Sequence, residues 1–347
     1  MSEPTVLHVM PHPGAGGERY VEMLEAMDGF RFERVALTEH RGKLEVLPGL
    51  IRARRAARRA DLVHVHGDSA AIACLRIIRR QPAVITFNGL HLWRRARGIP
   101  GRLVTFDLRR AIAAARASIC VSEAELRDAA DLAGPSLRDR LVRVDNGLPD
   151  PGPGDPAVRA ATRGELGLDE GDLAVLFIGQ LERRKGVLDL LDALERAGAK
   201  RPSLRGLIVG DGPLAETVAA RVDGERVRAL GHRGDVGALL DACDVFTLPS
   251  EREGISLALL EAMARERAVV VSDGPGNPDA VGDTGAIVPY GDVQALARAL
   301  ERLAGDPELR EELGRAARRR ILAAFTAERM VEETRRVYES ALRPRES

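Results

Sequence analysis

The stretch "AVLFIGQLERRKGVLDLLDAL", residues 174–194, decides the fold, because an apolar run is followed at once by a polar turn and a helical pattern. The run 174–178 is typical of a buried β-strand, and from Val187 onward the apolar side chains recur at helical spacing. Repeated units of this kind build a mostly parallel sheet with helices on its faces. The rest of the chain repeats the unit.

Short apolar runs alternate with helical patterns along both halves of the chain. In the first half we expect strands at 5–10, 34–38, 62–66, 83–88, 118–122 and 141–147. In the second half we expect them at 174–180, 206–212, 227–231, 245–250, 268–273 and 286–290. Between the two series lies "LPDPGPGDP", 148–156, whose four prolines and two glycines are typical of a linker.

This pattern predicts an α/β protein of two Rossmann-like domains that face each other across a cleft. We expect the first domain at 1–148 and the second at 149–325. The chain is helical by period from about Asp292. Its last helix, about 326–347, is expected to pack back on the first domain. A length of 347 residues agrees with two domains rather than one.

The composition is that of an ordinary globular protein, with 45% hydrophobic and 30% charged residues. No apolar run approaches the roughly 18 residues that span a bilayer, and "MSEPTVLHVM" lacks the basic start of a secretion signal. We therefore expect a cytoplasmic protein. Its widely spaced cysteines (Cys74, Cys120 and Cys243) are expected to be buried free thiols.

The net charge of zero conceals a basic region in the first half. Residues 41–116 contain 17 Lys and Arg against 4 Asp and Glu, concentrated in "IRARRAARRA" (51–60) and "WRRARGIPGR" (93–102). Such segments suit an anionic membrane surface, although a solvated helix face would have the same composition. Nucleic acid is not expected as a partner, because aromatic residues make up only 3% of the chain.

The first predicted strand is followed by the glycine-rich segment "PHPGAGGERYVEML", 11–24. Gly14, Gly16 and Gly17 are expected to form a turn into a helix whose free amides favour an anion, or simply a tight turn. A dinucleotide site with Glu39 as its acidic residue is the less favoured alternative. A GxGxxG motif would need glycine where Arg19 stands.

Two further turns follow strands of the second half. Lys185 and Gly186 stand at the start of a helix, where an ammonium group can neutralise a departing diphosphate. The segment is not a Walker A loop, because GxxxxGK[ST] is absent. In "IVGDGPL", 208–214, the turn around Gly212 either only ends a strand or closes over a nucleotide base.

The segment "SEREGISLALLEAM", 250–263, carries Glu253 and Glu261 eight positions apart. If the segment is helical, they lie about 12 Å apart, further than the roughly 5–9.5 Å of a catalytic carboxylate pair. They are therefore expected to bind hydroxyl groups at two ends of an elongated polar ligand. Gly254 allows backbone to approach that ligand, and Ser256 is expected to begin the helix.

In order and spacing these motifs resemble the GT-B glycosyltransferases of family GT4, whose signature is E-x7-E in the C-terminal domain. The resemblance covers nearly the whole chain. It rests on the following segments: Gly16–Gly17, "VSEAE" (121–125), "VDNGLP" (144–149), Lys185–Gly186, "GDGPL" (210–214), "GHRGDVGALLDACDVFTLPS" (231–250) and the two-glutamate segment.

The resemblance implies transfer of a sugar from a nucleotide-sugar donor, with retention of configuration and with neither metal nor other cofactor. The absence of any Asp-x-Asp sequence agrees with the last point. By position, Glu261 would hold the ribose and Glu253 the donor sugar, while Lys185 would neutralise the diphosphate. The other donor-binding positions that it implies are Gly16, Gly17, Gln180, Arg184, Gly212, Gly254, Ile255, Ser256 and Leu257.

Two positions depart from the family pattern. Gln180 stands where the family commonly has an arginine, so the diphosphate site is weaker unless Arg183 or Arg184 compensates. Asn88 stands where the family tends to have a histidine in the acceptor-side cleft. We expect His91, three residues further on, to serve as the catalytic-pocket histidine, although a histidine on a loop is more often only exposed.

The leading hypothesis is thus a retaining glycosyltransferase whose acceptor is a sugar, a glycan or a lipid-linked molecule at the inner membrane face. A nucleotide-sugar epimerase of the same fold remains an alternative within enzymes. A phosphorylase is disfavoured, because it should be larger. From another class, a non-catalytic sugar-nucleotide-binding subunit would also explain Gln180 and Asn88.

Overall fold

The computed structural model describes residues 3–12, 15–38 and 46–344. Gly14 and Glu39 lie outside the described residues. The chain forms two compact units. The N-terminal unit comprises Met1–Asn146 together with Ala327–Ser347, and the C-terminal unit comprises Gly147–Thr326.

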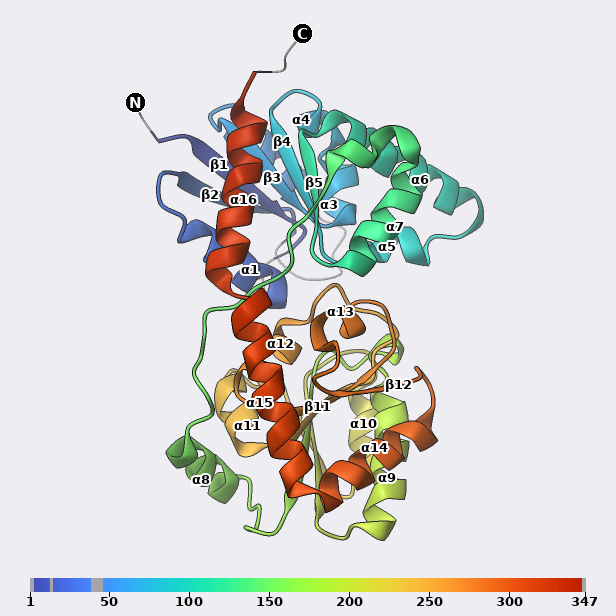
Figure 1. Ribbon diagram of the computed structural model, residues 1–347. Helices are drawn as coiled ribbons and strands as arrows, with labels where there is room; N and C mark the ends of the chain where they lie inside the picture. Colours follow the sequence, from blue (N-terminus) through green and yellow to red (C-terminus); the bar gives the residue numbers. More distant parts are fainter. Residues whose placement is uncertain (1–2, 13–14, 39–45, 345–347) are drawn as a thin grey trace. The chain divides into compact units, whose positions relative to one another are not determined.

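The N-terminal unit contains a parallel sheet whose strand order among the described residues is β2-β1-β3-β4-β5-β6 (Figure 1). Its central strands are buried along their whole length, as expected of a parallel sheet covered on both faces. The strands are β1 (Thr5–Met10), β2 (Arg31–Ala36), β3 (Leu62–His66), β4 (Ala83–Phe87), β5 (Ala117–Cys120) and β6 (Leu141–Arg143).

Helices of this unit connect the strands. They are α1 (Ala15–Glu25), α2 (Val46–Ala56), α3 (Asp68–Ala73), α4 (Leu75–Ile78), α5 (His91–Arg95), α6 (Gly98–Ala114), α7 (Glu123–Ala133) and the 3-10 helix η1 (Pro135–Arg140). The last helix, α16 (Ala327–Leu342), belongs to the same unit although it ends the chain. It buries Met330, Val337 and Tyr338 in the cluster formed with Val6 and Leu24.

The C-terminal unit contains a second parallel sheet, whose order among the described residues is β12-β11-β10-β7-β8-β9. Its strands are β7 (Leu173–Ile178), β8 (Leu204–Val209), β9 (Val227–Gly231), β10 (Val245–Leu248), β11 (Ala268–Ser272) and β12 (Ala286–Val288). The direction in which strands are added reverses between β7 and β10. β8 and β9 follow on one side of β7, and β10, β11 and β12 follow on its other side. A doubly wound sheet binds its ligands at such a reversal.

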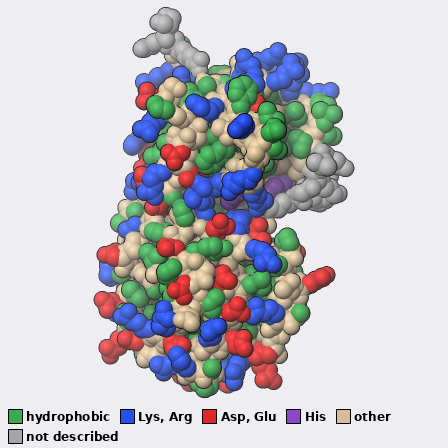
Figure 2. Space-filling model, turned by 90° about the vertical axis from the view of Figure 1, so that its right-hand side faces the viewer, with side chains coloured by type: hydrophobic (Ala, Val, Ile, Leu, Met, Phe, Trp, Pro, Cys, Tyr) green, Lys and Arg blue, Asp and Glu red, His purple; other side chains and the backbone are tan. Residues whose placement is uncertain are grey.

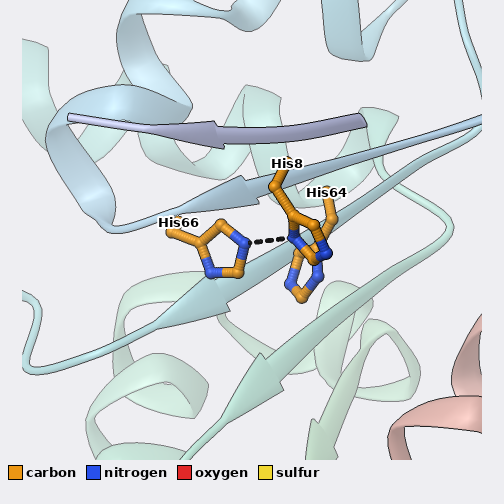
Figure 3. Close-up of side chains that lie close together, drawn as sticks. All are labelled: His8, His64 and His66. Atoms are coloured by element: carbon orange, nitrogen blue, oxygen red, sulfur yellow. Dashed lines mark hydrogen bonds between the residues drawn. The ribbon is translucent and has the colours of Figure 1, made fainter. Parts of the chain in front are cut away.

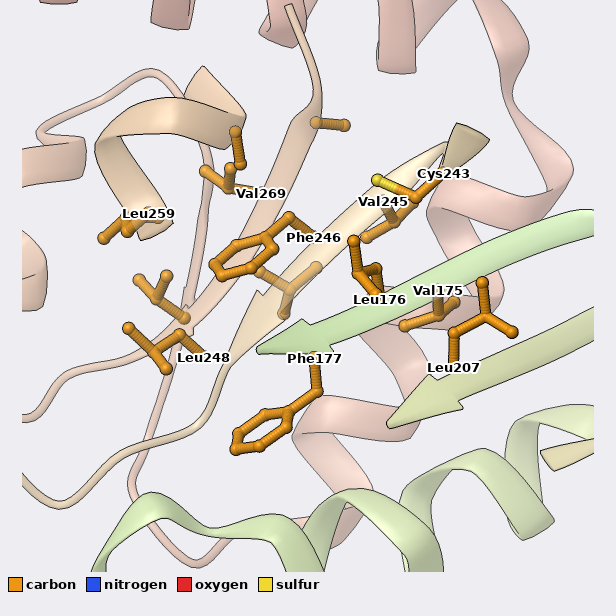
Figure 4. Packing of buried hydrophobic residues seen from close by; sticks show 14 of the residues in the cluster. Val175, Leu176, Phe177, Leu207, Cys243, Val245, Phe246, Leu248, Leu259 and Val269 are labelled. Atoms are coloured by element: carbon orange, nitrogen blue, oxygen red, sulfur yellow. The ribbon is translucent and has the colours of Figure 1, made fainter. Parts of the chain in front are cut away.

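Helices pack on both faces of this sheet and bury its apolar side chains. They are α8 (Pro156–Glu165), η2 (Arg183–Lys185), α9 (Val187–Lys200), α10 (Ala215–Arg221), α11 (Val236–Ala242), α12 (Leu257–Ala264), α13 (Asn277–Val281), α14 (Val293–Gly305) and α15 (Pro307–Ala324). Figure 4 shows Leu176, Phe177 and Phe246 among the side chains of this core. The sheet is thereby a rigid support for the loops at its strand ends.

The predicted α/β architecture of two Rossmann-like units is confirmed, although several predicted bounds differ from the structure; β6, for example, ends at Arg143 and not at residue 147. β2 covers Arg31–Ala36, not 34–38, because strand pairing with β1 begins at Thr5 opposite Arg31. The proline-rich linker ends one residue early, because Asp155 caps α8 and Pro156 is its first residue. Cys74, Cys120 and Cys243 are buried free thiols, as predicted.

A cluster of three buried histidines in the N-terminal unit was not anticipated. His8 lies opposite His64 in the β1–β3 register, and His66 lies two residues on, so all three point to one face of the sheet (Figure 3). His8 Nδ1 and His66 Nε2 are 2.9 Å apart. The ring of His64 lies between the hydroxyl groups of Tyr338 and Thr86, each 2.6 Å from a ring nitrogen.

Among the described residues, these histidines are also the group whose potential metal-ligand atoms come within 4.8 Å of one another. The rings of His64 and His66 pack with their centroids only 4.0 Å apart. Ring lone pairs lie in the ring plane, so rings packed over each other do not direct them at one point. Four of the six ring nitrogens take part in the hydrogen bonds above, whereas His8 Nε2 and His66 Nδ1 are buried without a partner among the described residues. The lowered pKa values make the cluster a group of neutral imidazoles.

The histidine cluster makes the stability of the N-terminal unit depend on pH. Burial lowers the pKa of His66 to about 3 and lowers the pKa of His8 and His64 well below the ordinary value. The unfolded chain takes up protons below pH about 6.5 that the folded unit does not. The stability contributed by neutral histidines is therefore complete above that pH and is lost as the pH falls.

We expect each of the three histidines to cost about 1.4 kcal/mol of unfolding free energy per pH unit below pH about 6.5. Urea unfolding followed by the fluorescence of Trp93, the one tryptophan of the chain and a residue of this unit, measures the effect. The decline should begin between pH 7 and 6, before carboxylates titrate. A constant unfolding free energy from pH 7.5 to 5.5 would contradict this account.

Candidate functional site

The turn after β7 places Lys185 at the carboxyl edge of the C-terminal sheet. Arg183–Lys185 form the 3-10 helix η2, and Gly186 follows with φ 67° as the N-cap of α9. A side chain at Gly186 would collide with the carbonyl oxygen of Pro249, at the end of β10. Glycine is therefore required for the close approach of these two loops.

Lys185 and Glu253 form an ion pair across the two loops. Lys185 Nζ donates to Glu253 Oε1 at 2.6 Å, and the side chains are only 13% and 9% exposed. Burial alone would raise the pKa of Glu253. The Lys185 ammonium, together with a hydrogen bond from Ser250 and the charge of Arg184, more than offsets burial, so the pKa of Glu253 lies below its ordinary value. Glu253 is therefore ionised at neutral pH.

The loop 249–256 is fixed by backbone hydrogen bonds on both sides. The N–H of Glu251 donates to the carbonyl of Arg184 at 2.8 Å. The N–H of Glu253 donates to the carbonyl of Pro275 at 2.9 Å. The loops after β7, β10 and β11 thus form one connected surface, with Glu253 at its centre.

The loop after β11 contacts the Glu253 loop and the end of β10 directly. The side-chain amide of Asn277 donates to the carbonyls of Leu248 and Ser272, at 3.2 and 3.3 Å. Gly276, with φ 94°, lies so close that a Cβ there would be 2.4 Å from the carbonyl oxygen of Glu253. These residues are not apparent from the sequence, because a single asparagine and a single glycine form no motif. Their importance follows from contacts between loops.

The helix that carries Glu261 begins at Leu257, one residue after Ser256, which was expected to begin it. Ser256 is its N-cap and its hydroxyl accepts from the N–H of Leu259, so Ile255 and Ser256 precede the helix and Leu257 is its first residue. A serine in this place satisfies a helix N–H that has no backbone partner. Glu261 lies on the second turn and is 4% exposed.

Gly212 lies in the turn after β8, next to the Lys185 loop. Gly210 and Gly212 adopt φ 140° and 152°. A Cβ on Gly212 would lie 2.7 Å from the carbonyl oxygen of Leu181, which also accepts from the N–H of Leu214 at 2.8 Å. The turn predicted from "GDGPL" is thus packed directly against the segment that leads to Lys185.

The structure gives Gln180 and Arg184 different surroundings. Gln180 is half-buried in the turn after β7. Arg184 forms an ion pair with Glu182 at 2.7 Å and also contributes to the lowered pKa of Glu253. Compensation for Gln180 by Arg184 is thus consistent with their positions, and it stays a prediction.

The other predicted site residues lie in the N-terminal unit. Gly16 and Gly17 are part of the first turn of α1, not of a turn before it. The N–H groups of a first turn have no intrahelical partner. His91 is the first residue of α5 and is partly exposed. The carboxylate of Asp68 fixes the start of that helix by accepting from the N–H groups of Leu92 and Trp93, at 2.6 and 3.1 Å.

The C-terminal unit therefore presents an ammonium and two buried carboxylates near the reversal point of its sheet. A cation can neutralise phosphate charge, and buried carboxylates accept hydrogen bonds from hydroxyl groups. The glycines at 186, 212 and 276 let the loops that carry these groups pack closely against neighbouring backbone. This is a set of groups suited to a ligand that contains both phosphate and sugar.

Two family models match the chain, one in each half. The model described as Glycosyltransferase Family 4 matches residues 3–150. The model described as Glycosyl transferases group 1 matches residues 172–306, which include Lys185, Glu253 and Glu261.

Curated relatives agree with these matches. Alpha-maltose-1-phosphate synthase of Mycobacterium tuberculosis is 31% identical over 309 residues, which cover 82% of this chain and 80% of that protein. N-acetyl-alpha-D-glucosaminyl L-malate synthase of Bacillus anthracis is 31% identical over 185 residues, which cover 52% of this chain and 48% of that protein.

Solved structures show the same fold at low sequence identity. Anabaena Alr3699/HepE in complex with UDP and glucose has a TM-score of 0.81 and 20% identity, covering 97% of this chain and all of that one. WaaG, a glycosyltransferase involved in lipopolysaccharide biosynthesis, has a TM-score of 0.76 and 16% identity, with 96% and 99% coverage.

Proposed function

The chain belongs to the family GT4, group 1 glycosyltransferases of GT-B fold, and from that premise we propose that it transfers a sugar with retention of configuration and without a metal. Its donor is a nucleotide sugar and its acceptor a hydroxyl group of a sugar, a glycan or a lipid-linked molecule. The Lys185–Glu253 ion pair at the reversal point of the C-terminal sheet carries the proposal.

In this proposal the bound donor separates Lys185 from Glu253. The diphosphate takes Lys185 as its counter-ion, and Glu253 then accepts from hydroxyl groups of the donor sugar. Glu261 accepts from the ribose hydroxyls. The N–H groups at the start of α12 and the backbone at Gly254 support sugar and phosphate. Charge that develops on the leaving diphosphate is stabilised by Lys185, which raises the rate of bond cleavage.

Retention and independence from metal are tested together. A thermal-shift screen against UDP-, GDP-, ADP- and TDP-sugars first identifies the donor, since a ligand at 100 times its dissociation constant stabilises the fold by about 2.7 kcal/mol. Proton NMR of the product formed in excess EDTA then reports its anomeric configuration. Product of the donor's configuration, formed at an undiminished rate, supports the proposal. An inverted product, or a rate restored only by a divalent cation, contradicts it.

A non-catalytic sugar-nucleotide-binding subunit is the second candidate, and Gln180 is the observation that favours it. Without an arginine there, the diphosphate has a weaker counter-charge. Tight donor binding with no transfer to any acceptor would support this candidate. An epimerase is distinguished by consumption of the nucleotide sugar with no acceptor present.

We also propose that α6 brings the N-terminal unit to an anionic membrane surface. Ile99, Leu103 and Phe106 of this helix are 74%, 59% and 58% exposed, and arginines flank them. The N-terminal unit is drawn in the upper part of Figure 2. On the face that this view shows, it presents many basic and few acidic side chains. Among the described residues, no helix has the length and apolar composition needed to cross a bilayer, so the proposed contact is peripheral.

The membrane contact predicts salt-sensitive sedimentation. The protein should sediment with vesicles of phosphatidylglycerol and phosphatidylcholine at about 10 mM salt and be released at about 500 mM, because screening shortens the reach of its arginines. Replacing Leu103 and Phe106 by serine should weaken the low-salt binding several-fold. Equal binding to pure phosphatidylcholine, or none at low salt, would contradict the contact.

A further inference from the structure

A pocket of about 580 Å³ lies between α5 and α6 of the N-terminal unit. It is separate from the residues assigned above to the donor. Its main lining side chains are Trp93, Arg94, Arg97, Arg102, Phe106 and Arg109. Four of the residues that line this pocket are arginines, and its volume is that of a small-molecule site.

Within the described residues, one of these four arginines is paired with a carboxylate. Arg94 forms an ion pair with Asp128. In the part of the chain that the structure describes, Arg97, Arg102 and Arg109 have no ion pair with a carboxylate. Several positive charges in one place create a positive potential that attracts an anion.

Hydrogen bonds hold the backbone and the Trp93 side chain at the pocket in place. The indole N–H of Trp93 donates to the hydroxyl of Thr105 at 3.0 Å, and that hydroxyl donates to the carbonyl of Gly101 at 2.8 Å. Asp68 fixes the backbone at Trp93, as described above. Gly101 lies so close to Ala96 that a Cβ there would be 2.8 Å from its carbonyl oxygen. The backbone and the Trp93 side chain at the pocket are therefore fixed and need little ordering on binding.

We propose that this pocket binds a phosphate group, as a phosphomonoester or phosphodiester. Guanidinium groups bind phosphate oxygens through paired N–H donors, and several around one pocket match an anion of multiple oxygens better than a single carboxylate. Trp93 and Phe106 offer an apolar surface to whatever carries the phosphate. The ligand is a phosphate-bearing acceptor or a phospholipid headgroup. Its identification as the acceptor rests on the proposed function.

Trp93 makes the pocket directly observable, because it is the one tryptophan of the chain. Its fluorescence is recorded during titration with inorganic phosphate or glycerol phosphate at constant ionic strength. A second arm uses vesicles of phosphatidylglycerol in phosphatidylcholine, compared with phosphatidylcholine alone. The test variant replaces Arg102 and Arg109 by glutamine. The matched control replaces Arg298 and Arg302, exposed residues of α14 in the C-terminal unit.

We expect a saturable fluorescence change that the R102Q/R109Q variant weakens at least about tenfold and the R298Q/R302Q control leaves unchanged. A change with soluble phosphate supports a phosphorylated small molecule. A change confined to anionic vesicles, with the same dependence on Arg102 and Arg109, supports a lipid headgroup. No saturable change with either probe, or an equal loss in the control, overturns the proposal.

Donor binding separates this proposal from the proposed function. The R102Q/R109Q variant should keep the thermal shift produced by the sugar nucleotide, because the replaced residues belong to the other unit. A protein that binds phosphate at Trp93 but no sugar nucleotide would refute the proposed function and leave the pocket intact. A protein that binds the sugar nucleotide but no phosphate at Trp93 would refute the phosphate site and leave the proposed function intact.

Discussion

Replacing Lys185 by alanine is expected to lower kcat by about 10²- to 10³-fold, because the leaving diphosphate loses its counter-charge. The same change leaves the carboxylate of Glu253 buried with no ammonium beside it. Breaking a buried pair in this way costs about 3–5 kcal/mol of stability. A loss of activity alone would therefore not separate a catalytic role from a structural one.

The double variant Lys185→Ala with Glu253→Ala makes that separation. It removes both buried charges, so its unfolding free energy, measured by circular dichroism in urea, should recover toward that of the wild type. Turnover should stay at least as low as in the single variant. If the double variant recovered activity along with stability, or if Lys185→Ala kept full turnover, Lys185 would have no role in the reaction.

Replacing Glu261 by alanine is expected to raise the dissociation constant of the sugar nucleotide by about 10²-fold. Hydrogen bonds to a charged acceptor contribute about 1.5–3 kcal/mol each, and a ribose presents two hydroxyl donors. The loss should be equal for the nucleoside diphosphate without its sugar, since the contact is to the ribose. Isothermal titration calorimetry with both ligands measures it.

Asp172→Asn is the matched control for this measurement. Asp172 is also a buried carboxylate of the C-terminal unit, 9% exposed, but it precedes β7 at the opposite edge of the sheet and pairs with Arg205 at 2.9 Å. Its replacement should leave donor affinity unchanged, whatever it costs in stability. Equal losses for Glu261→Ala and Asp172→Asn would show that Glu261 acts only through the fold.

Much of the architecture was predictable because apolar runs and helical spacing are local signals. The strands at 5–10, 62–66 and 227–231 were predicted to the residue. The start of β2 was wrong, because "RFERVA" alternates charged and apolar residues at a sheet edge, and its limits depend on pairing with β1. Pairing is a long-range property that one strand's sequence does not contain.

The order of the motifs around Lys185, Glu253 and Glu261 was also legible in the sequence. The ion pair between Lys185 and Glu253 was not, since the two residues are 68 positions apart and meet only because Gly186 lets their loops touch. Asn277 and Gly276 were missed for the same reason.

The sequence does contain a pattern from which the histidine cluster could be predicted. His64 and His66 alternate along one strand and so share a face, and the middle of the neighbouring strand carries His8. Each histidine alone resembles a satisfied core residue. The cluster emerges only when the two strands are placed side by side, as the parallel β1–β3 pairing requires.

A crystal structure with the sugar nucleotide bound tests the central claim most directly. The account predicts ribose hydroxyls at hydrogen-bond distance from the Glu261 carboxylate, and sugar hydroxyls at the Glu253 carboxylate. It also predicts that Lys185 Nζ contacts a phosphate oxygen. A nucleotide bound away from these three side chains, with the Lys185–Glu253 pair intact and Glu261 facing only protein, would contradict it.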